Sequence, residues 1–147
     1  MQSQHKPQNP GYRAWVEGIF EKAAFIKNQG IKLVDCGPGW CECRLDVRPD
    51  HLQQDGYVHA AVVAAMADHS AGASAGTLAP MGKMSLTVEF KINLLRPGIG
   101  HALRCRADVL RAGRSITVSE SEVYVVGDNR EKLIAKAIVT LALVTQG

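Results

Sequence analysis

One stretch of this chain, residues 58–78, consists almost entirely of small or apolar residues. It predicts a single long helix, which the turn residues Pro80, Met81 and Gly82 would end. A helix that is apolar nearly all round is normally buried, because no face of it is suited to water. The rest of the chain must therefore curl around this segment, and few folds offer that arrangement.

The segments around this helix carry the periodicities of an amphipathic helix and six strands. Residues 12–27 repeat apolar positions at helical spacing, and Gly30 follows as a stop signal. Short turns separate successive strands, which indicates antiparallel pairing. We therefore expect an α+β fold in which one antiparallel sheet wraps around the long central helix. The expected strands are 31–35, 40–47, 84–95, 102–110, 115–126 and 133–144.

The length of 147 residues predicts one domain over residues 11–147, preceded by a flexible polar tail over residues 1–10. A net charge of +3 is too small to indicate a nucleic-acid partner. No apolar run approaches the ~20 residues that cross a bilayer, and the tail lacks the apolar segment of a signal peptide. We therefore expect a cytoplasmic protein without a membrane partner.

The cysteines indicate neither a metal site nor a disulfide framework. Their spacing matches no zinc-ligand pattern, and no histidines are grouped near them. The expected state is four reduced thiols, mostly buried, that behave as small apolar side chains. These residues are Cys36, Cys41, Cys43 and Cys105.

The long helix carries one acid, Asp68, in its middle. A carboxylate in an apolar helix is costly unless it is paired or used in chemistry. No basic residue stands three or four positions away, and the small neighbours leave space for another molecule. Asp68 is therefore the leading candidate for a catalytic base or nucleophile, the alternative being a distant Arg or Lys partner, or simple exposure. His69 points about 100° away around the helix and is expected to be structural.

The start of the helix is the second candidate site. Backbone N–H groups at Ala60 and Ala61 lack intrahelical acceptors and suit a developing oxyanion, unless the preceding loop caps them. Ala60 and Asp68 are eight residues apart, which places them about 12 Å apart along the axis. One carbonyl cannot reach both groups of the same helix. A site that uses both therefore requires two chains related by a two-fold axis.

Four further residues near these groups are candidates for supporting roles. His51 and His59 flank the polar loop, either as a general base or by ordering the loop through backbone hydrogen bonds. Gln53 has an amide N–H that suits a carbonyl or a water molecule. Thr87 belongs to the polar face of the 84–95 strand, opposite the apolar face that includes Val88, and would hold a water or support Asp68.

Basic residues gather at strand ends and turns. The turn over residues 111–115 combines two guanidinium groups with an expected free backbone amide at Gly113, which suits a phosphate. An ordinary charged hairpin tip is the alternative. The basic residues concerned are Lys83, Arg96, Arg111 and Arg114.

The loop and helix together resemble the hotdog-fold acyl-CoA thioesterases of the PaaI-like type, over about residues 12–145. That family has His-x-Asn-x-x-Gly-x-x-His-Gly-Gly, with an Asp eight residues after the first Gly of the pair. Gln in place of Asn, and Ala-Ala in place of Gly-Gly, are the departures here, and they bear on the shape of the substrate. The same register is occupied by His51, Gln53, Gly56, His59, Ala60, Ala61 and Asp68.

The resemblance implies a thioesterase that needs no cofactor, takes acyl-CoA as substrate, and forms a homodimer or homotetramer. Asp68 would be the nucleophile or general base, facing the loop of the partner subunit, with the Ala60 N–H as oxyanion donor. Gln53 would position the carbonyl or the water, His59 would order the loop, and Thr87 would hold the water. The residues implied for binding the nucleotide end of CoA are Arg111, Gly113, Arg114, Ser115 and Lys83.

Two other functions on the same fold stay open at this stage. A non-catalytic acyl-CoA binder or sensor is suggested by the departures at Gln53 and Ala60. A hydratase or dehydratase would pair His59 with Asp68 as acid and base. Release of free thiol from a saturated acyl-CoA separates both from a thioesterase, because neither would produce it.

Overall fold

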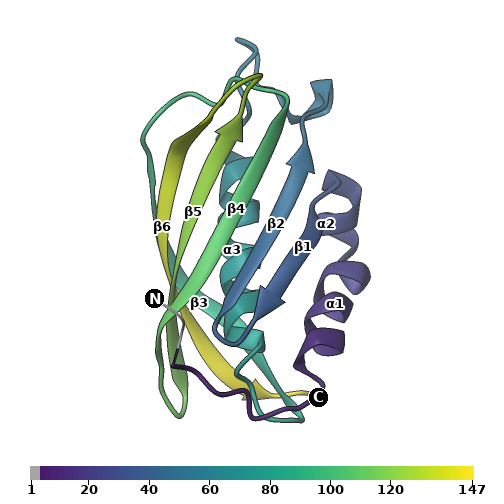
Figure 1. Cartoon of the computed structure of the whole chain (residues 1–147), viewed down its shortest axis with the longest axis vertical. Helices are drawn as coiled ribbons and strands as arrows, with labels where there is room; N and C mark the ends of the chain where they lie inside the picture. The colour runs from purple at the N-terminus through teal and green to yellow at the C-terminus, as the bar shows by residue number, and fades with distance from the viewer. Residues whose placement is uncertain (1–3) are drawn as a thin grey trace.

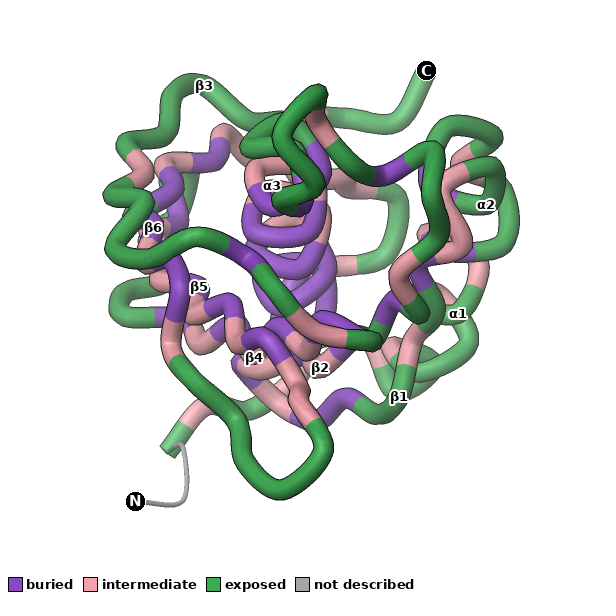
Figure 2. The backbone as a smooth tube through the Cα atoms, turned by 90° about the horizontal axis from the view of Figure 1, so that it is seen from above, coloured by how far each residue is buried: buried purple, intermediate pink, exposed green. Residues whose placement is uncertain are grey.

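Six strands form one antiparallel sheet that curves around the long helix α3 (Ala60–Gly76), as Figures 1 and 2 show. This computed structural model describes residues 4–147, so residues 1–3 of the expected tail lie outside the described residues. The strand order is β1-β2-β4-β5-β6-β3, and every strand and α3 ends within two residues of its predicted bounds. The strands are β1 (Lys32–Gly37), β2 (Trp40–Asp46), β3 (Lys83–Leu94), β4 (Ala102–Ala112), β5 (Ile116–Val126) and β6 (Glu131–Thr145).

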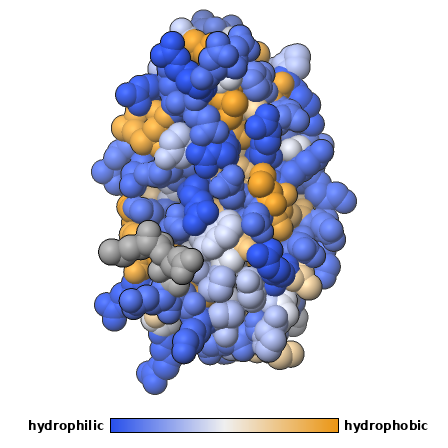
Figure 3. All heavy atoms as spheres, in the orientation of Figure 1, coloured by the Kyte–Doolittle hydropathy of each residue, from blue (hydrophilic) through white to orange (hydrophobic). Residues whose placement is uncertain are grey.

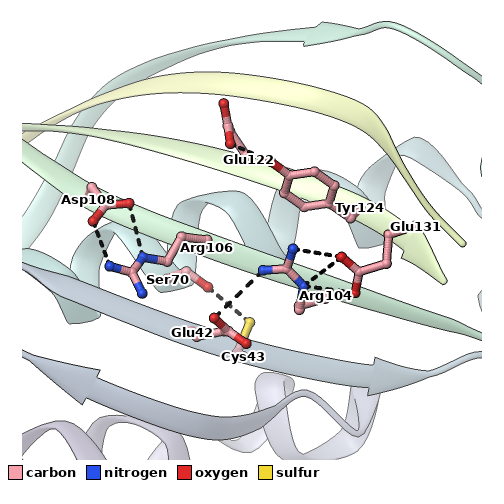
Figure 4. Close-up of polar contacts among 9 residues, drawn as sticks. All are labelled: Glu42, Cys43, Ser70, Arg104, Arg106, Asp108, Glu122, Tyr124 and Glu131. Atoms are coloured by element: carbon pink, nitrogen blue, oxygen red, sulfur yellow. Dashed lines mark hydrogen bonds and ion pairs between the residues drawn. The ribbon is translucent and has the colours of Figure 1, made fainter. Parts of the chain in front are cut away.

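Helix α3 forms the centre of the core. It packs against β2, β3, β4, β5 and β6, and Figure 2 shows its buried turns inside the curved sheet. Small polar groups join the helix to the sheet: the Ser121 hydroxyl donates to the Ala67 carbonyl at 2.7 Å, and Ser70 Oγ lies 3.0 Å from Cys43 Sγ (Figure 4). The prediction that the sheet curls around an apolar helix is confirmed.

The N-terminal segment forms two helices where the sequence predicts one. Helix α1 covers Tyr12–Lys22 and α2 covers Ala24–Gln29, with Ala23 between them at ψ 96°. In one straight helix, Ile26 would point about 120° away from Phe20. The break buries both side chains, each only 5% exposed, so packing overrides the helical periodicity here.

The edge strand β3 contains a bulge at Val88, where its register with β6 shifts between Thr87 and Glu89. Strict alternation would place Thr87 and Ile92, five residues apart, on opposite faces. Thr87 instead hydrogen-bonds to α3 while Ile92 packs against the core, so both face the helix. The expectation that the apolar residues of this strand share one face is therefore wrong, because the bulge adds one unpaired residue.

The outer face of the sheet is predominantly hydrophilic (Figure 3). Arg104 of β4 lies 2.8 Å from a Glu131 oxygen and 3.6 Å from Glu42, and Arg106 lies 3.0 Å from Asp108 (Figure 4). Residues of β2 alternate between this face and the core, as the sequence predicts for a strand with one solvated face.

The four cysteines are reduced and buried, as expected. Burial raises the pKa of the Cys36 and Cys41 thiols, so they stay protonated and unreactive at neutral pH. Residues 4–147 contain no group of three His, Cys, Asp or Glu side chains placed to hold a metal ion. None of the helices in the described range is long and apolar enough to span a bilayer.

Candidate active site

Asp68 lies half-buried in the middle of α3. Its Oδ1 accepts a hydrogen bond from the Thr87 hydroxyl of β3 at 2.6 Å. No ion pair within residues 4–147 includes Asp68, so a basic partner is absent from the described chain. Thr87 therefore fixes one carboxylate oxygen and leaves Oδ2 available to a water molecule or a substrate.

Asp68 and Thr87 line a cleft of about 500 Å³, which we call the Asp68 cleft. It lies between α1 and β3, and residues of α3 form its floor. Trp15 and Ile19 belong to its α1 wall, and Gly72, one helical turn after Asp68, belongs to its floor. Helical spacing from Asp68 already indicates that position 72 shares its face, but the contribution of α1 has no signal in the sequence.

His69 also lines the Asp68 cleft, although the sequence predicts only a structural role. Its ring packs edge-on against Phe20, with the centroids 4.6 Å apart. Its Nε2 is buried without a hydrogen-bond partner within residues 4–147. Burial lowers the pKa of His69, so the imidazole is neutral at physiological pH.

The polar loop before α3 is closed by its own hydrogen bonds. Leu52 and Val58 form an isolated antiparallel bridge, and the Gln53 amide donates to the Tyr57 carbonyl at 2.8 Å. His51 is buried: its Nδ1 accepts from the Arg48 amide at 3.0 Å, and its Nε2 lies 2.8 Å from the carbonyl oxygen of residue 29. Both ring nitrogens are engaged, which favours the loop-ordering role of His51 over that of a general base.

At the start of α3, His59 is the N-cap, and its Nδ1 accepts the Ala61 amide at 2.9 Å. The Ala60 amide has no hydrogen-bond acceptor among residues 4–147, so it is the available donor at this helix end. The Gln53 side chain is turned onto its own loop, where its Oε1 accepts the amides of Asp55 and Tyr57. In this structure Gln53 therefore orders the loop with its oxygen.

Ala60 and Gln53 line a second cleft of about 400 Å³, which we call the Ala60 cleft. Its lining shares no residue with that of the Asp68 cleft. Residues at the start of β3 line the Asp68 cleft, whereas Leu94 at its other end lines the Ala60 cleft. One chain therefore holds the carboxylate and the free amide in separate clefts near opposite ends of β3, in agreement with the helical distance between them.

The basic residues do not form one cluster. Arg96 lies beyond the end of β3 in the Ala60 cleft, whereas Lys83 begins β3 and donates to Thr145 Oγ1 at 2.9 Å. The Gly113 amide donates to the Ile116 carbonyl at 2.8 Å, so the expectation of a free amide there is wrong: closing the tight β4–β5 turn uses it. The side chains of Arg111, Arg114 and Ser115 are exposed and remain candidates for contact with a phosphate.

Comparison with known proteins finds a matching family model and similar solved structures. The family model described as Thioesterase superfamily matches residues 55–132. No curated protein matches the chain. A thioesterase family protein of Silicibacter pomeroyi is 31% identical with a TM-score of 0.90, covering 92% of this chain and 100% of that one. A conserved protein of Pseudomonas aeruginosa is 32% identical with a TM-score of 0.76. The match covers 83% of this chain and 94% of the Pseudomonas chain.

The PaaI protein of Escherichia coli, from the phenylacetic acid degradation operon, shares the fold. Its TM-score is 0.80 at 19% identity, over 92% of this chain and 96% of that chain. The expected hotdog architecture, a long helix wrapped by an antiparallel sheet, is thereby confirmed.

Proposed function

This chain belongs to the thioesterase superfamily, and from that premise we propose that it is an acyl-CoA thioesterase, which hydrolyses an acyl-CoA to the free acid and CoA. One observation carries the proposal. The Asp68 carboxylate lies in a cleft without a cationic partner within residues 4–147, and Thr87 orients it through a 2.6 Å hydrogen bond. A partly desolvated, oriented carboxylate is suited to act on a water molecule or a carbonyl carbon.

In the proposed mechanism, the thioester carbonyl oxygen accepts the Ala60 N–H at the positive end of α3. This contact stabilises the oxyanion of the tetrahedral intermediate. Asp68 takes a proton from the attacking water, or attacks the carbonyl carbon directly. The intermediate then collapses, the carbon–sulfur bond breaks, and CoA leaves as a thiolate. On the base route the acid is released directly, and the proton held by Asp68 passes to the thiolate. On the direct route the acyl group is left as an anhydride on Asp68, which water hydrolyses to the free acid and the original carboxylate.

We further propose that the active form is at least a homodimer that joins through β3. An edge strand offers unpaired backbone groups, and this one also carries exposed apolar side chains. A two-fold axis across the middle of β3 would exchange its two ends. That exchange would bring the Asp68 cleft of one protomer beside the Ala60 cleft of its partner and form two equivalent sites. The exposed apolar residues are Leu86 (50%), Val88 (61%), Phe90 (43%) and Leu94 (53%).

For the nucleotide end of CoA, the candidates are the exposed side chains of the β4–β5 turn and the ammonium group of Lys83. Lys83 and this turn lie at the same end of the sheet. The β6 residues Leu143 and Thr145 contact Ser115 and Lys83 respectively, through hydrogen bonds of 2.8 and 2.9 Å. Guanidinium and ammonium groups are suited to phosphate oxygens.

The test is thiol release from a panel of saturated acyl-CoA thioesters, with Asp68→Asn as the matched variant. Asn keeps the shape and can still accept from Thr87, but it cannot take up a proton. Turnover by the wild type and a loss of at least about 100-fold in the variant support the proposal. Binding of acyl-CoA without thiol release would identify a binder or a hydratase instead, and a variant within a few-fold of the wild type would remove Asp68 from the mechanism.

A further inference from the structure

We infer that the Asp68 cleft holds the acyl chain of the substrate and limits a straight chain to about ten carbons. This inference rests on the proposed function, because it takes Asp68 to mark the position of the thioester carbonyl. It goes further by assigning a chain class and the residues that set it.

The walls of the cleft suit an alkyl chain. Trp15 and Ile19 of α1 present apolar surface on one side, and residues 84–87 at the start of β3 line the other. The neutral His69 ring completes the floor beside Asp68. Burying each further CH₂ group of a chain in such surroundings strengthens binding about fourfold, so affinity rises with length until the cleft is full.

Contacts between α1 and α3 set the length of the cleft. At Gly72 the floor has room for a methyl group, since a Cβ added there would meet its nearest neighbour, Leu141 Cδ2, at an ordinary contact distance of 3.8 Å. At Gly76 the helices meet, because a Cβ there would lie 3.1 Å from Ile19 Cδ1 and 3.6 Å from Trp15 Nε1. The space along α3 therefore begins at Asp68, passes Gly72 and closes at Gly76.

The spacing along the helix converts to a chain length. Asp68 and Gly76 are eight residues apart, or about 12 Å along the axis at the α-helical rise. An extended alkyl chain advances about 1.25 Å per carbon, from its bond lengths and angles. A chain that begins at Asp68 thus meets the closed end after about ten carbons, and it passes Gly72 after about five.

Two substitutions change this length in opposite directions. Gly72→Leu fills the floor one turn from Asp68, so it should shorten the accepted chain to about five carbons. Trp15→Ala removes a ring from the closed end, so it should extend the accepted chain beyond ten carbons. Gly72→Ala adds only a methyl group at the same position, so it should shorten the accepted chain less than Gly72→Leu does. Glu17→Ala, on α1 but outside this cleft, is the control for the second.

The experiment measures kcat/KM, and separately Kd by calorimetry on the Asp68→Asn background, for saturated acyl-CoA thioesters of two to sixteen carbons. We expect both affinity and kcat/KM of the unmodified cleft to rise to eight or ten carbons. At sixteen carbons kcat/KM should be at least about tenfold below its maximum, with affinity no longer rising. The maximum should move down in Gly72→Leu and up in Trp15→Ala.

Equal preference for eight and sixteen carbons, or an unchanged maximum in both folded variants, would overturn the inference. In that case, hydrolysis that still depends on Asp68 would leave the proposed function in place. The opposite result, a length limit in Kd that moves with both variants but no hydrolysis of any thioester, would support the assignment of the cleft and refute the proposed function.

Discussion

A site shared between two protomers can be tested by mixing two variants that are each inactive. Asp68→Asn removes the proton acceptor and leaves the Ala60 amide intact. Ala60→Pro does the opposite, because proline has no N–H. Proline is favoured at the first position of a helix, and His59 already has φ −61° and ψ 137°, which suits a residue before proline. Since the Ala60 amide makes no hydrogen bond within residues 4–147, Ala60→Pro should fold normally. Asp68→Asn should do so too, because the Asn oxygen can still accept from Thr87.

The expected magnitudes follow from the roles of the two groups. Loss of one oxyanion donor lowers kcat by about 10²–10³-fold, and loss of a general base by about 10²–10⁴-fold. In a heterodimer of the two variants, one site receives Asp68 from one chain and Ala60 from the other, both unaltered. Its second site carries both substitutions. The heterodimer should therefore show about half the activity of the wild type, far above either parent.

The assay places a different affinity tag on each variant, purifies the heterodimer through both tags in sequence, and measures thiol release. A wild-type dimer carrying the same two tags is the control. A purified heterodimer no more active than its parents would refute the idea that the carboxylate and the amide meet across a subunit boundary.

Three further predictions concern single groups. Thr87→Val should lower kcat by about 10-fold, far less than Asp68→Asn, because it removes only the hydrogen bond that orients the carboxylate; a loss as large as that of Asp68→Asn would make Thr87 a direct participant. Ellman's reagent should modify none of the four buried cysteines before unfolding and all four afterwards, so a thiol that reacts in the native protein would contradict the burial described above. The Arg104 guanidinium, by hydrogen bonding, lowers the pKa of Glu131 below its ordinary 4.5, so this contribution to stability is present above pH 4.5 and is lost as the pH falls through the lowered value. Thermal unfolding of Arg104→Met should therefore give a smaller drop in Tm below pH 4.5 than the wild type, and equal drops would count against this pair.

Much of this fold is predictable because a single segment dominates it. An apolar helix must be enclosed, and six alternating segments joined by short turns leave one antiparallel sheet to enclose it. Asp68 and Ala60 are predictable for a related reason: their separation on a rigid helix is fixed by residue count alone. The position of Trp15 relative to Asp68 has no such fixed spacing, because Trp15 reaches the α1 wall of the Asp68 cleft only through the tertiary packing of α1.

Two of the errors in the predictions come from tertiary packing and one from a local turn. The break at Ala23 places Ile26 in the core against the periodicity of the segment. The Gly113 amide is taken up by its own turn, and Arg96 lies at the end of β3 opposite Lys83. The positions of Ile26 and Arg96 depend on neighbours that are distant in the sequence, which local patterns do not indicate. The acceptor of the Gly113 amide, by contrast, lies only three residues away in the same turn.

The extra residue at Val88 reverses the alternation of side chains along β3, so different parities face α3 before and after it. In the part of β3 before Val88, the odd-numbered Thr87 faces α3. In the part after it, the even-numbered Ile92 faces α3. Deleting Val88 would remove the extra residue and leave the β3–β6 pairs on either side of it unchanged, so Thr87 and Ile92 would both still face α3. The bulge thus lets one strand present the Thr87 hydroxyl to Asp68 and the Ile92 side chain to the core on the same face.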